Sequence, residues 1–215
     1  MRIDVWSDVV CPFCFLGEKN LATALEGFEH ADEVSVFWHS FQLDPTSEPG
    51  PAGGDIEMLK AKYGMSDEQV RANHDRLAAA GREAGIDFRF DLAHTDNTFD
   101  AHRVLQLAGE HDRGTELNDR LLTAHFTEGK LVSDHDTLAD LAAEVGLDAE
   151  EVRTALASDA YADDVRADIA QAHAYGISAV PTFVIDEQYG VTGAQPPEAL
   201  RQALDEVWSK SVAEV

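Results

Sequence analysis

The pattern of apolar and polar residues at the start of the chain predicts a strand, a helix and a second strand. Residues 2–6 alternate apolar and polar side chains before ending on Val5 and Trp6, and residues 34–43 are rich in valine and aromatic residues. Segments of this kind are typical of β-strands. Between them, residues 11–28 repeat apolar side chains every three to four positions, as an amphipathic helix does. We therefore expect a β-α-β opening.

A long helical block is expected next, after a loop rich in proline and glycine at residues 44–55. In this block apolar residues recur at helical spacing, and several of the expected helices close on glycine. One of them opens with the capping-box pattern Ser66-x-x-Gln69. The pattern contains no fixed-period repeat, so it predicts an irregular all-helical segment of roughly residues 55–170.

Strand character returns at residues 180–186 and 189–194, and a last helix is expected after the second of these. Two strands alone make a marginal sheet, so the early and the late strands are expected to share one sheet. The fold class is therefore α/β. We predict one domain formed by residues 1–54 and 171–215, interrupted by a helical insertion domain of residues 55–170.

The charge of the chain restricts its partners. There are 41 Asp and Glu residues against 16 Lys and Arg, which gives a net charge of −25. Binding to phosphate groups needs clustered Lys and Arg, so we expect no nucleic acid and no membrane as partners. A strongly solvated surface accounts for the acidity, while a high-salt habitat or a basic partner are alternatives that the sequence leaves open.

The N-terminal segment predicts a cytoplasmic protein. It lacks the long apolar stretch of a secretory signal, and cleavage of a signal of about 15–30 residues would remove Cys11 and Cys14, the only two cysteines. No segment approaches the roughly 18 apolar residues of a transmembrane helix. In a reducing compartment, a cysteine pair is more often catalytic or metal-binding than structural.

The two cysteines lie three positions apart in SDVVCPFCFLG, residues 7–17. Pro12 is favoured in the first turn of a helix, so we expect Cys11 at a helix N-terminus and Cys14 one turn inside. The helix dipole and the free backbone N–H groups at that end favour a thiolate. An exposed attacking thiol and a sheltered resolving thiol are the parts that thiol–disulfide exchange needs.

Zinc binding and inert buried thiols are the alternatives for this pair. A structural zinc site needs about four ligands. The chain has no second Cys-x-x-Cys, and none of its nine histidines forms an obvious His-x3–5-His pair beside the cysteines. We therefore expect no metal, and redox chemistry is the favoured interpretation.

A second notable feature, Pro181 in GISAVPTFV, lies far downstream at the start of an expected strand. A proline there suits a position that donates no hydrogen bond to the sheet, and a cis peptide bond after Val180 is the other interpretation.

Four segments in this order resemble the DsbA-type branch of the thioredoxin superfamily, and more narrowly its cytoplasmic FrnE-like group: SDVVCPFCFLG, NTFDAHRVLQLA, GISAVPTFVID and GAQPPE. The similarity covers about residues 2–208, and the group is related to 2-hydroxychromene-2-carboxylate isomerases. The resemblance implies a thioredoxin-like fold with a large all-helical insertion. It also implies a dithiol–disulfide oxidoreductase of the protein disulfide isomerase type.

The resemblance assigns roles residue by residue. It implies that Cys11 is the nucleophile, that Cys14 is the resolving thiol and that Pro181 is a cis-proline lying against the pair. It further implies a set of residues that bind the substrate: Pro12, Phe13, Val180 and Pro181. Two positions depart from the group: where this chain has Phe13 and His39, the group more often has Trp and Arg. The reduction potential and the substrate therefore do not follow from the resemblance.

Two histidines invite a functional interpretation. His39 either tunes the pKa of Cys11 or is a hydrogen-bonded strand residue, and His102 either faces the active-site cleft or packs its own helix. We favour the structural role for both.

Three functions remain, of which disulfide exchange with protein or small-molecule thiols is favoured. It requires no cofactor, although glutathione is a candidate co-substrate. A glutathione-dependent isomerase or kappa-class transferase-like enzyme is the alternative, but such relatives as a rule use a single Ser or Cys and do not need Cys14. A holdase-like protein with an apolar groove is the third. The physiological substrate, the direction of electron flow and the oligomeric state do not follow from the sequence.

Overall fold

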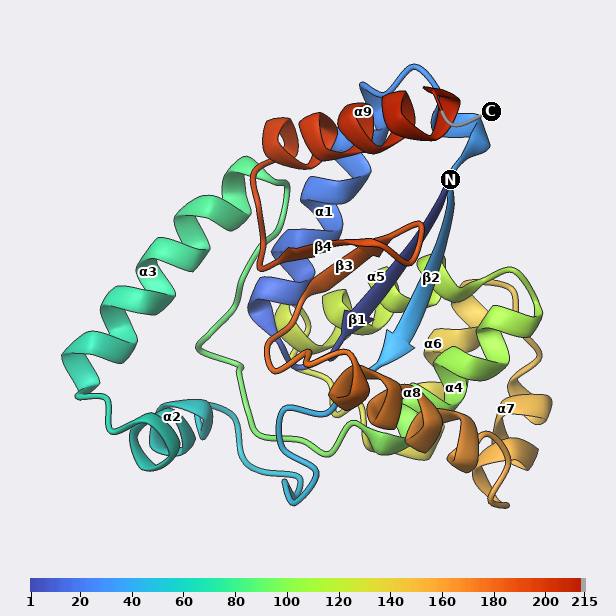
Figure 1. Cartoon of the computed structure of the whole chain (residues 1–215). Helices are drawn as coiled ribbons and strands as arrows, with labels where there is room; N and C mark the ends of the chain where they lie inside the picture. Colours follow the sequence, from blue (N-terminus) through green and yellow to red (C-terminus); the bar gives the residue numbers. More distant parts are fainter. Residues whose placement is uncertain (214–215) are drawn as a thin grey trace.

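A four-stranded mixed sheet lies at the centre of the computed structural model, which describes residues 1–213 (Figure 1). The strand order is β2-β1-β3-β4. β1 pairs in parallel with β2 and antiparallel with β3, and β3 pairs antiparallel with β4. The strands are β1 (Arg2–Ser7), β2 (Ser35–Ser40), β3 (Thr182–Ile185) and β4 (Tyr189–Thr192). The predicted sharing of one sheet by the early and the late strands is confirmed.

Helix α1 (Pro12–Glu26) makes the crossover that two parallel strands require, and a short 3₁₀ helix, η1 (Ala31–Glu33), leads into β2. Together with the last helix, α9 (Pro197–Ala213), α1 covers one face of the sheet. Apolar side chains from the sheet and from both helices form this core; they include Ile3, Val5, Leu21, Phe183 and Leu204.

The opposite face of the sheet lies against helix α8 (Ala162–Ala174). Because side chains alternate along a strand, Trp6 points to this face while its neighbour Val5 points to the other. Trp6 is 1% exposed, and its indole N–H donates to the carbonyl oxygen of Asp168 at 3.2 Å. The α8 face is therefore a second core that also reaches Cys11 and Cys14.

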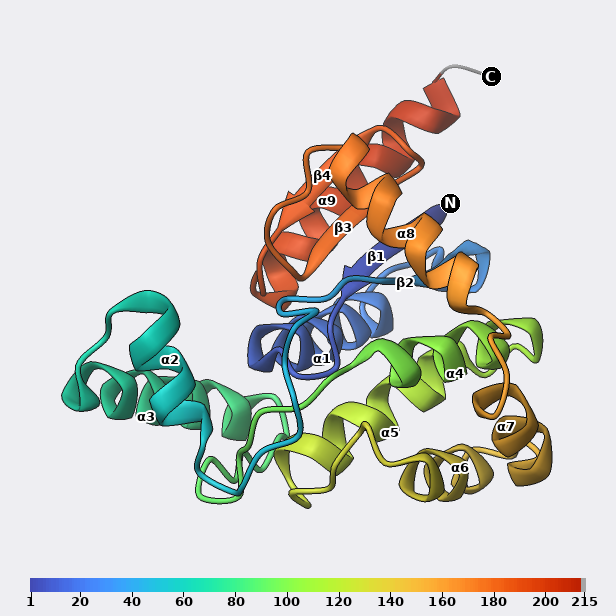
Figure 2. The ribbon, with the colours of Figure 1, turned by 90° about the horizontal axis from the view of Figure 1, so that it is seen from below.

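The segment between β2 and β3 is helical, as predicted. It contains α2 (Asp55–Tyr63), α3 (Asp67–Glu83), α4 (Phe99–Glu110), α5 (Gly114–Phe126), α6 (His135–Glu144), α7 (Ala149–Leu156) and α8. Figure 2 shows α4 to α7 packed together beside the sheet, while α2 and α3 extend to the other side. The predicted capping box at Ser66 and Gln69 is confirmed, with both of its hydrogen bonds formed.

Two details differ from the predicted boundaries. The strand expected over residues 34–43 ends at Ser40, because its partner strand β1 ends at Ser7. The backbone N–H of Phe41 still donates to Ser7 at 3.1 Å, but its carbonyl oxygen lies 2.9 Å from the His102 ring. Residue 170, where we placed the end of the insertion, lies inside α8, which continues along the sheet to Ala174. The division into two domains stays a prediction. None of the helices within residues 1–213 is long and apolar enough to cross a membrane.

Candidate active site

The Cys-x-x-Cys motif occupies the first turn of α1. Cys11 is the N-cap residue, with extended backbone angles (φ −99°, ψ 112°), and Pro12 is the first helical residue. The backbone N–H of Cys11 donates to Asp8, and that of Cys14 donates to the carbonyl oxygen of Cys11, each at 3.0 Å. No side chain caps this helix, so the positive end of its dipole faces the Cys11 sulfur. The predicted position at a helix start is confirmed.

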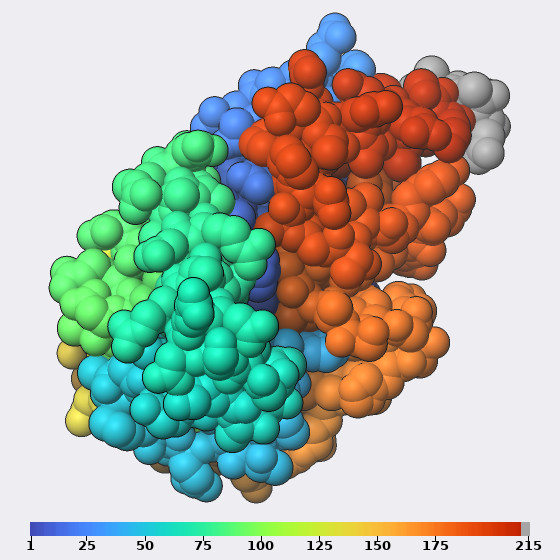
Figure 3. Space-filling view, turned by 90° about the vertical axis from the view of Figure 1, so that its left-hand side faces the viewer, coloured from blue at the N-terminus to red at the C-terminus, as the bar shows by residue number. Residues whose placement is uncertain are grey.

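Both cysteines are free thiols, and both are more buried than the sequence suggested. Cys11 is 4% exposed and Cys14 is 1% exposed, which corrects the expectation of an openly exposed attacking thiol. Cys11 instead lines a cavity of about 400 Å³, together with Pro12, Phe13 and Val180. In Figure 3 the dark blue N-terminal part of the chain is visible in a groove between the teal helices and the orange and red C-terminal part.

Burial separates the two thiols chemically. It raises the pKa of Cys14 well above the usual value, and the neighbouring Cys11 raises it further. The thiolate is the nucleophilic form of cysteine, so a thiol that resists ionisation is a poor attacking group. Cys14 therefore suits a role that begins only after Cys11 has reacted.

The segment around Pro181 lies directly against the motif, although it is 170 residues away in sequence. The Val180–Pro181 peptide bond is cis, and the Cys11 thiol donates to the carbonyl oxygen of Val180 at 3.7 Å. Gly17 makes this packing possible, because a Cβ at that position would lie 2.7 Å from the Pro181 ring. The structure thus brings together all the residues assigned to the site, and Phe13, 44% exposed, lies at its rim.

His102 fixes the loop that leads into the motif. Its ring is 1% exposed, and Nε2 lies 2.9 Å from the carbonyl oxygen of Phe41 and 3.3 Å from Oδ1 of Asp8. The other Asp8 oxygen accepts from the backbone N–H of Leu43 at 2.7 Å. His102 is therefore a buried positioning residue behind Asp8, in agreement with the structural role that we favoured.

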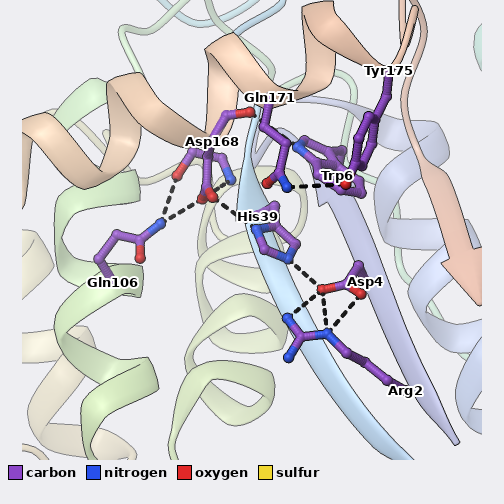
Figure 4. A network of polar contacts seen from close by, with 9 residues as sticks. Arg2, Asp4, Trp6, His39, Gln106, Asp168, Gln171 and Tyr175 are labelled. Atoms are coloured by element: carbon purple, nitrogen blue, oxygen red, sulfur yellow. Dashed lines mark hydrogen bonds and ion pairs between the residues drawn. The ribbon is translucent and has the colours of Figure 1, made fainter. Parts of the chain in front are cut away.

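His39 belongs to a charged network away from the thiols (Figure 4). Its Nδ1 lies 2.8 Å from Asp168 on α8, and its Nε2 lies 2.7 Å from Asp4 on β1. The ring also stacks on Trp6, with centroids 4.5 Å apart. Arg2 binds the same Asp4 carboxylate. His39 does not line the cavity, so it is a hydrogen-bonded strand residue.

The pKa shifts in this network have a common cause. Burial lowers the pKa of His39, but the hydrogen bonds and charges of Asp168 and Asp4 outweigh it and raise the pKa. Burial also raises the pKa of each carboxylate, yet their cationic partners hold both pKa values below normal. The two carboxylates therefore stabilise the charged form of the His39 imidazole that lies between them.

Two further parts of the cavity wall were missed by the sequence reasoning. One is apolar and comes from α2, α3 and the loops after each of them, with Met58, Leu59, Met65, Leu77 and Phe90. The other is a cluster of His94, Asp96 and His125. Amphipathic helices supplied a signal for the first, but nothing in the sequence shows that their apolar faces meet Cys11. The second comes from separate segments and had no spacing signal.

Comparisons with known proteins place this geometry in a family. Residues 2–205 match the DSBA-like thioredoxin domain family. The uncharacterized protein YwbO of Bacillus subtilis (strain 168) is 31% identical over 217 residues, covering 98% of each chain.

Two solved structures are similar in fold. A probable DsbA oxidoreductase from Streptomyces coelicolor is 43% identical, with a TM-score of 0.91 over 97% of this chain and 90% of that one. The cytosolic disulfide reductase DsbM from Pseudomonas aeruginosa, solved with GSH, is 19% identical, with a TM-score of 0.67 over 97% and 100% of the chains.

The helix-start cysteine pair, the cis-proline beside it and the split sheet around a helical insertion are thus found together in a chain that matches the family model along nearly its whole length. The fold is thioredoxin-like with a helical insertion, as the resemblance implied. The chain belongs to the DSBA-like thioredoxin domain family of oxidoreductases.

Proposed function

We propose that this protein is a cytoplasmic dithiol–disulfide oxidoreductase, in which Cys11 attacks and Cys14 resolves. The observation that carries the proposal is the position of the Cys11 sulfur, at the N-terminus of α1 and 3.7 Å from the Val180 carbonyl oxygen, with Cys14 buried one turn behind it. Membership of an oxidoreductase family and the likeness to the Streptomyces coelicolor protein support it.

The first step forms a mixed disulfide. The Cys11 thiolate attacks one sulfur of a substrate disulfide, the bond between the two substrate sulfurs breaks, and the second sulfur leaves as a thiolate that takes up a proton. The α1 dipole stabilises the attacking thiolate. Backbone groups of Val180 beside the sulfur offer hydrogen bonds to an extended substrate segment.

The second step releases the substrate. Cys14 loses its proton and attacks the Cys11 sulfur, which forms the Cys11–Cys14 disulfide and frees the reduced substrate. The charge of the Cys11 thiolate is one reason why the pKa of Cys14 is raised. Once Cys11 is bonded to substrate that charge is gone, so ionisation of Cys14 becomes easier at the step that needs it. Two molecules of glutathione would return the pair to the dithiol state and leave as glutathione disulfide.

The cavity wall indicates the kind of substrate. The exposed ring of Phe13 and the apolar side chains of the α2–α3 segment lie around the thiol. The cationic side chain lining this cavity is Lys62, which pairs with Asp44 at 3.2 Å. The wall also carries the carboxylates of Asp8, Asp44, Asp55 and Asp96. We therefore infer that preferred substrates place an apolar group, such as an apolar side chain of a peptide, beside the reacting sulfur, while glutathione serves as a small general thiol.

The variant Cys14→Ser is expected to trap the first intermediate. With oxidised glutathione, it should accumulate one stable Cys11–glutathione adduct per chain, because serine cannot displace the bound sulfur. The wild-type protein should instead release glutathione and become oxidised at both cysteines. Intact-mass spectrometry under acid quench distinguishes these products, and the double variant Cys11→Ser/Cys14→Ser is the control that should remain unmodified.

Two results would contradict the proposal. One is a Cys14→Ser protein that forms no adduct. The other is a wild-type protein without exchange activity whose Cys14→Ala variant still isomerises a chromene carboxylate with glutathione, since that result favours the glutathione-dependent isomerase.

A further inference from the structure

Three potential metal ligands gather on the wall of the cavity that contains Cys11. His94 and Asp96 lie in the segment between α3 and α4, and His125 lies at the end of α5. All three are buried, with 5%, 3% and 2% of their surfaces exposed. One ligand atom from each residue lies within 4.8 Å of the others. Two imidazoles and one carboxylate are a donor set that first-row transition metals bind.

The His94 ring is oriented as a ligand would be. Its Nδ1 lies 3.2 Å from the carbonyl oxygen of Leu92, which can only accept, so the Nδ1 proton is held there. This tautomer leaves the lone pair on Nε2. That atom is buried without a hydrogen-bond partner among the described residues, and it lies 3.9 Å from Oδ2 of Asp96. A backbone carbonyl behind a histidine is the usual outer support of a metal ligand.

Asp96 is held in place by backbone donors. Its Oδ2 accepts from the N–H groups of Val132 at 2.6 Å and Ser133 at 3.2 Å, and its Oδ1 accepts from Asn97 at 3.0 Å. A carboxylate has about four lone-pair positions, so three backbone bonds leave capacity for one more partner. The bonds come from two different segments, which holds the carboxylate in place beside His94.

His125 completes the set as a buried imidazole. Its ring lies edge-on to that of His94, with ring centroids 4.7 Å apart. Its Nδ1 is also buried without a partner within the described chain. Two unpaired imidazole nitrogens beside a buried carboxylate cost free energy that a bound ion would recover.

We propose that His94, Asp96 and His125 form a binding site for a divalent first-row transition metal, with Zn²⁺ as its representative, on the wall of the Cys11 cavity. Zinc binds such donors at about 2.0–2.2 Å, so two donor atoms on one ion lie no more than roughly 4.4 Å apart. The 3.9 Å between Nε2 of His94 and Oδ2 of Asp96 is within that limit, and small side-chain movements bring all three ligand atoms, which lie within 4.8 Å of one another, onto one ion. Three protein ligands leave a coordination position free, as in catalytic zinc sites. That position faces the cavity and accepts a carboxylate or thiolate of a molecule bound beside Cys11. The site does not depend on the proposed function.

The test uses the Cys11→Ser/Cys14→Ser protein, because thiolates also bind zinc and would mask a second site. Calorimetric titration with Zn²⁺ is expected to show one ion bound per chain. In this background, His94→Gln and His125→Gln should each weaken binding by at least about 10–100-fold, the loss seen when merely an outer support is removed. The control is His74→Gln, which removes a histidine paired with Asp55 on another wall of the same cavity and should leave zinc binding unchanged.

Thermal unfolding provides a second measurement and a check on folding. Zn²⁺ should raise the melting temperature of the cysteine-free background and of His74→Gln, but not that of His94→Gln or His125→Gln. Absence of binding to the background, or equal binding by all four proteins, overturns the metal site. Because both cysteines are absent from the tested protein, either result leaves the proposed disulfide exchange intact.

Discussion

Replacement of Cys11 by serine is expected to lower the rate of disulfide exchange to that of the reaction without protein. Of the two thiols, Cys11 lines the cavity. Cys14 is buried one turn further into α1, and its raised pKa disfavours the reactive thiolate. A serine hydroxyl at the same position cannot form a mixed disulfide, so no later step can follow. Reduction of insulin disulfides by glutathione, followed by turbidity, measures the loss.

A matched control separates this chemical effect from loss of the fold. Serine differs from cysteine by one atom, and the hydrogen bond from the Cys11 sulfur to the carbonyl oxygen of Val180 is long, at 3.7 Å. The melting temperature of Cys11→Ser should therefore stay close to that of the wild type. A folded Cys11→Ser protein that still reduces insulin at the wild-type rate would overturn the assignment of Cys11 as the nucleophile.

Replacement of Asp168 by alanine is expected to lower the free energy of unfolding by about 3 kcal/mol, the lower end for a buried ion pair that loses one partner, because the His39 and Asp168 side chains are 16% and 13% exposed. The Asp168 carboxylate accepts from His39 at 2.8 Å, from the backbone of Ser40 at 2.8 Å and from Gln106 at 2.6 Å. It thereby joins α8 and α4 to β2, and alanine would remove this shared acceptor from all three donors (Figure 4). Urea unfolding measures the difference.

The pH dependence of that difference identifies its electrostatic origin. The pKa of His39 is raised from 6.5, so its contribution is fully present below pH 6.5 and is lost as the pH rises through the folded-state value. The pKa of Asp168 is lowered from 3.8, so its contribution is present above pH 3.8 and is lost as the pH falls through the folded-state value. The loss of stability caused by Asp168→Ala should therefore be greatest at pH values between the folded-state pKa of Asp168 and that of His39. It should be smaller at lower and at higher pH.

Asp163→Ala is the matched control on the same helix. Asp163 is fully solvated and pairs with Arg166 one turn away on the surface. Such surface changes alter stability by about 0.5 kcal/mol or less. A cost of Asp168→Ala that is as small as this, or that does not vary with pH, would show that the charged network is not what holds α8 to the sheet.

The fold was largely predictable because its signals are local. Apolar periodicity identified the strands and the helices, and a Cys-Pro pair is a helix-start signal within two residues. The end of β2 was misplaced because Phe41 is as apolar as a strand residue, yet its carbonyl oxygen lies against His102 of α4 and not against a neighbouring strand. No local pattern contains that contact.

The site was predictable only where a motif or a resemblance carried it. The proximity of Pro181 to Cys11 followed from the resemblance, and the physical condition for it, the missing side chain of Gly17, became visible only in three dimensions. Asp4 is a buried acidic residue in the middle of a strand and binds His39. An acidic residue at such a position is a sign of a buried polar network, but the apolar periodicity of the strand does not show it.

The cluster on the cavity wall shows the limit of spacing arguments. No two histidines with the spacing of a zinc-binding pair lie beside the cysteines, so the sequence alone predicts no metal. His94 and Asp96 share a loop, but His125 is about thirty residues further on, and α5 brings it back to them. Ligand sets of this kind are defined by tertiary packing.

The central claim, that Cys11 and Cys14 form a reversible redox pair, is tested most directly by equilibrating the protein with mixtures of reduced and oxidised glutathione. The account predicts one intramolecular Cys11–Cys14 disulfide, whose fraction follows a two-electron curve with a tenfold change in the equilibrium constant per roughly 30 mV. Acid quench, alkylation and mass spectrometry measure that fraction at each ratio. A protein that stays a dithiol, or carries only glutathione adducts, at every ratio would contradict the account.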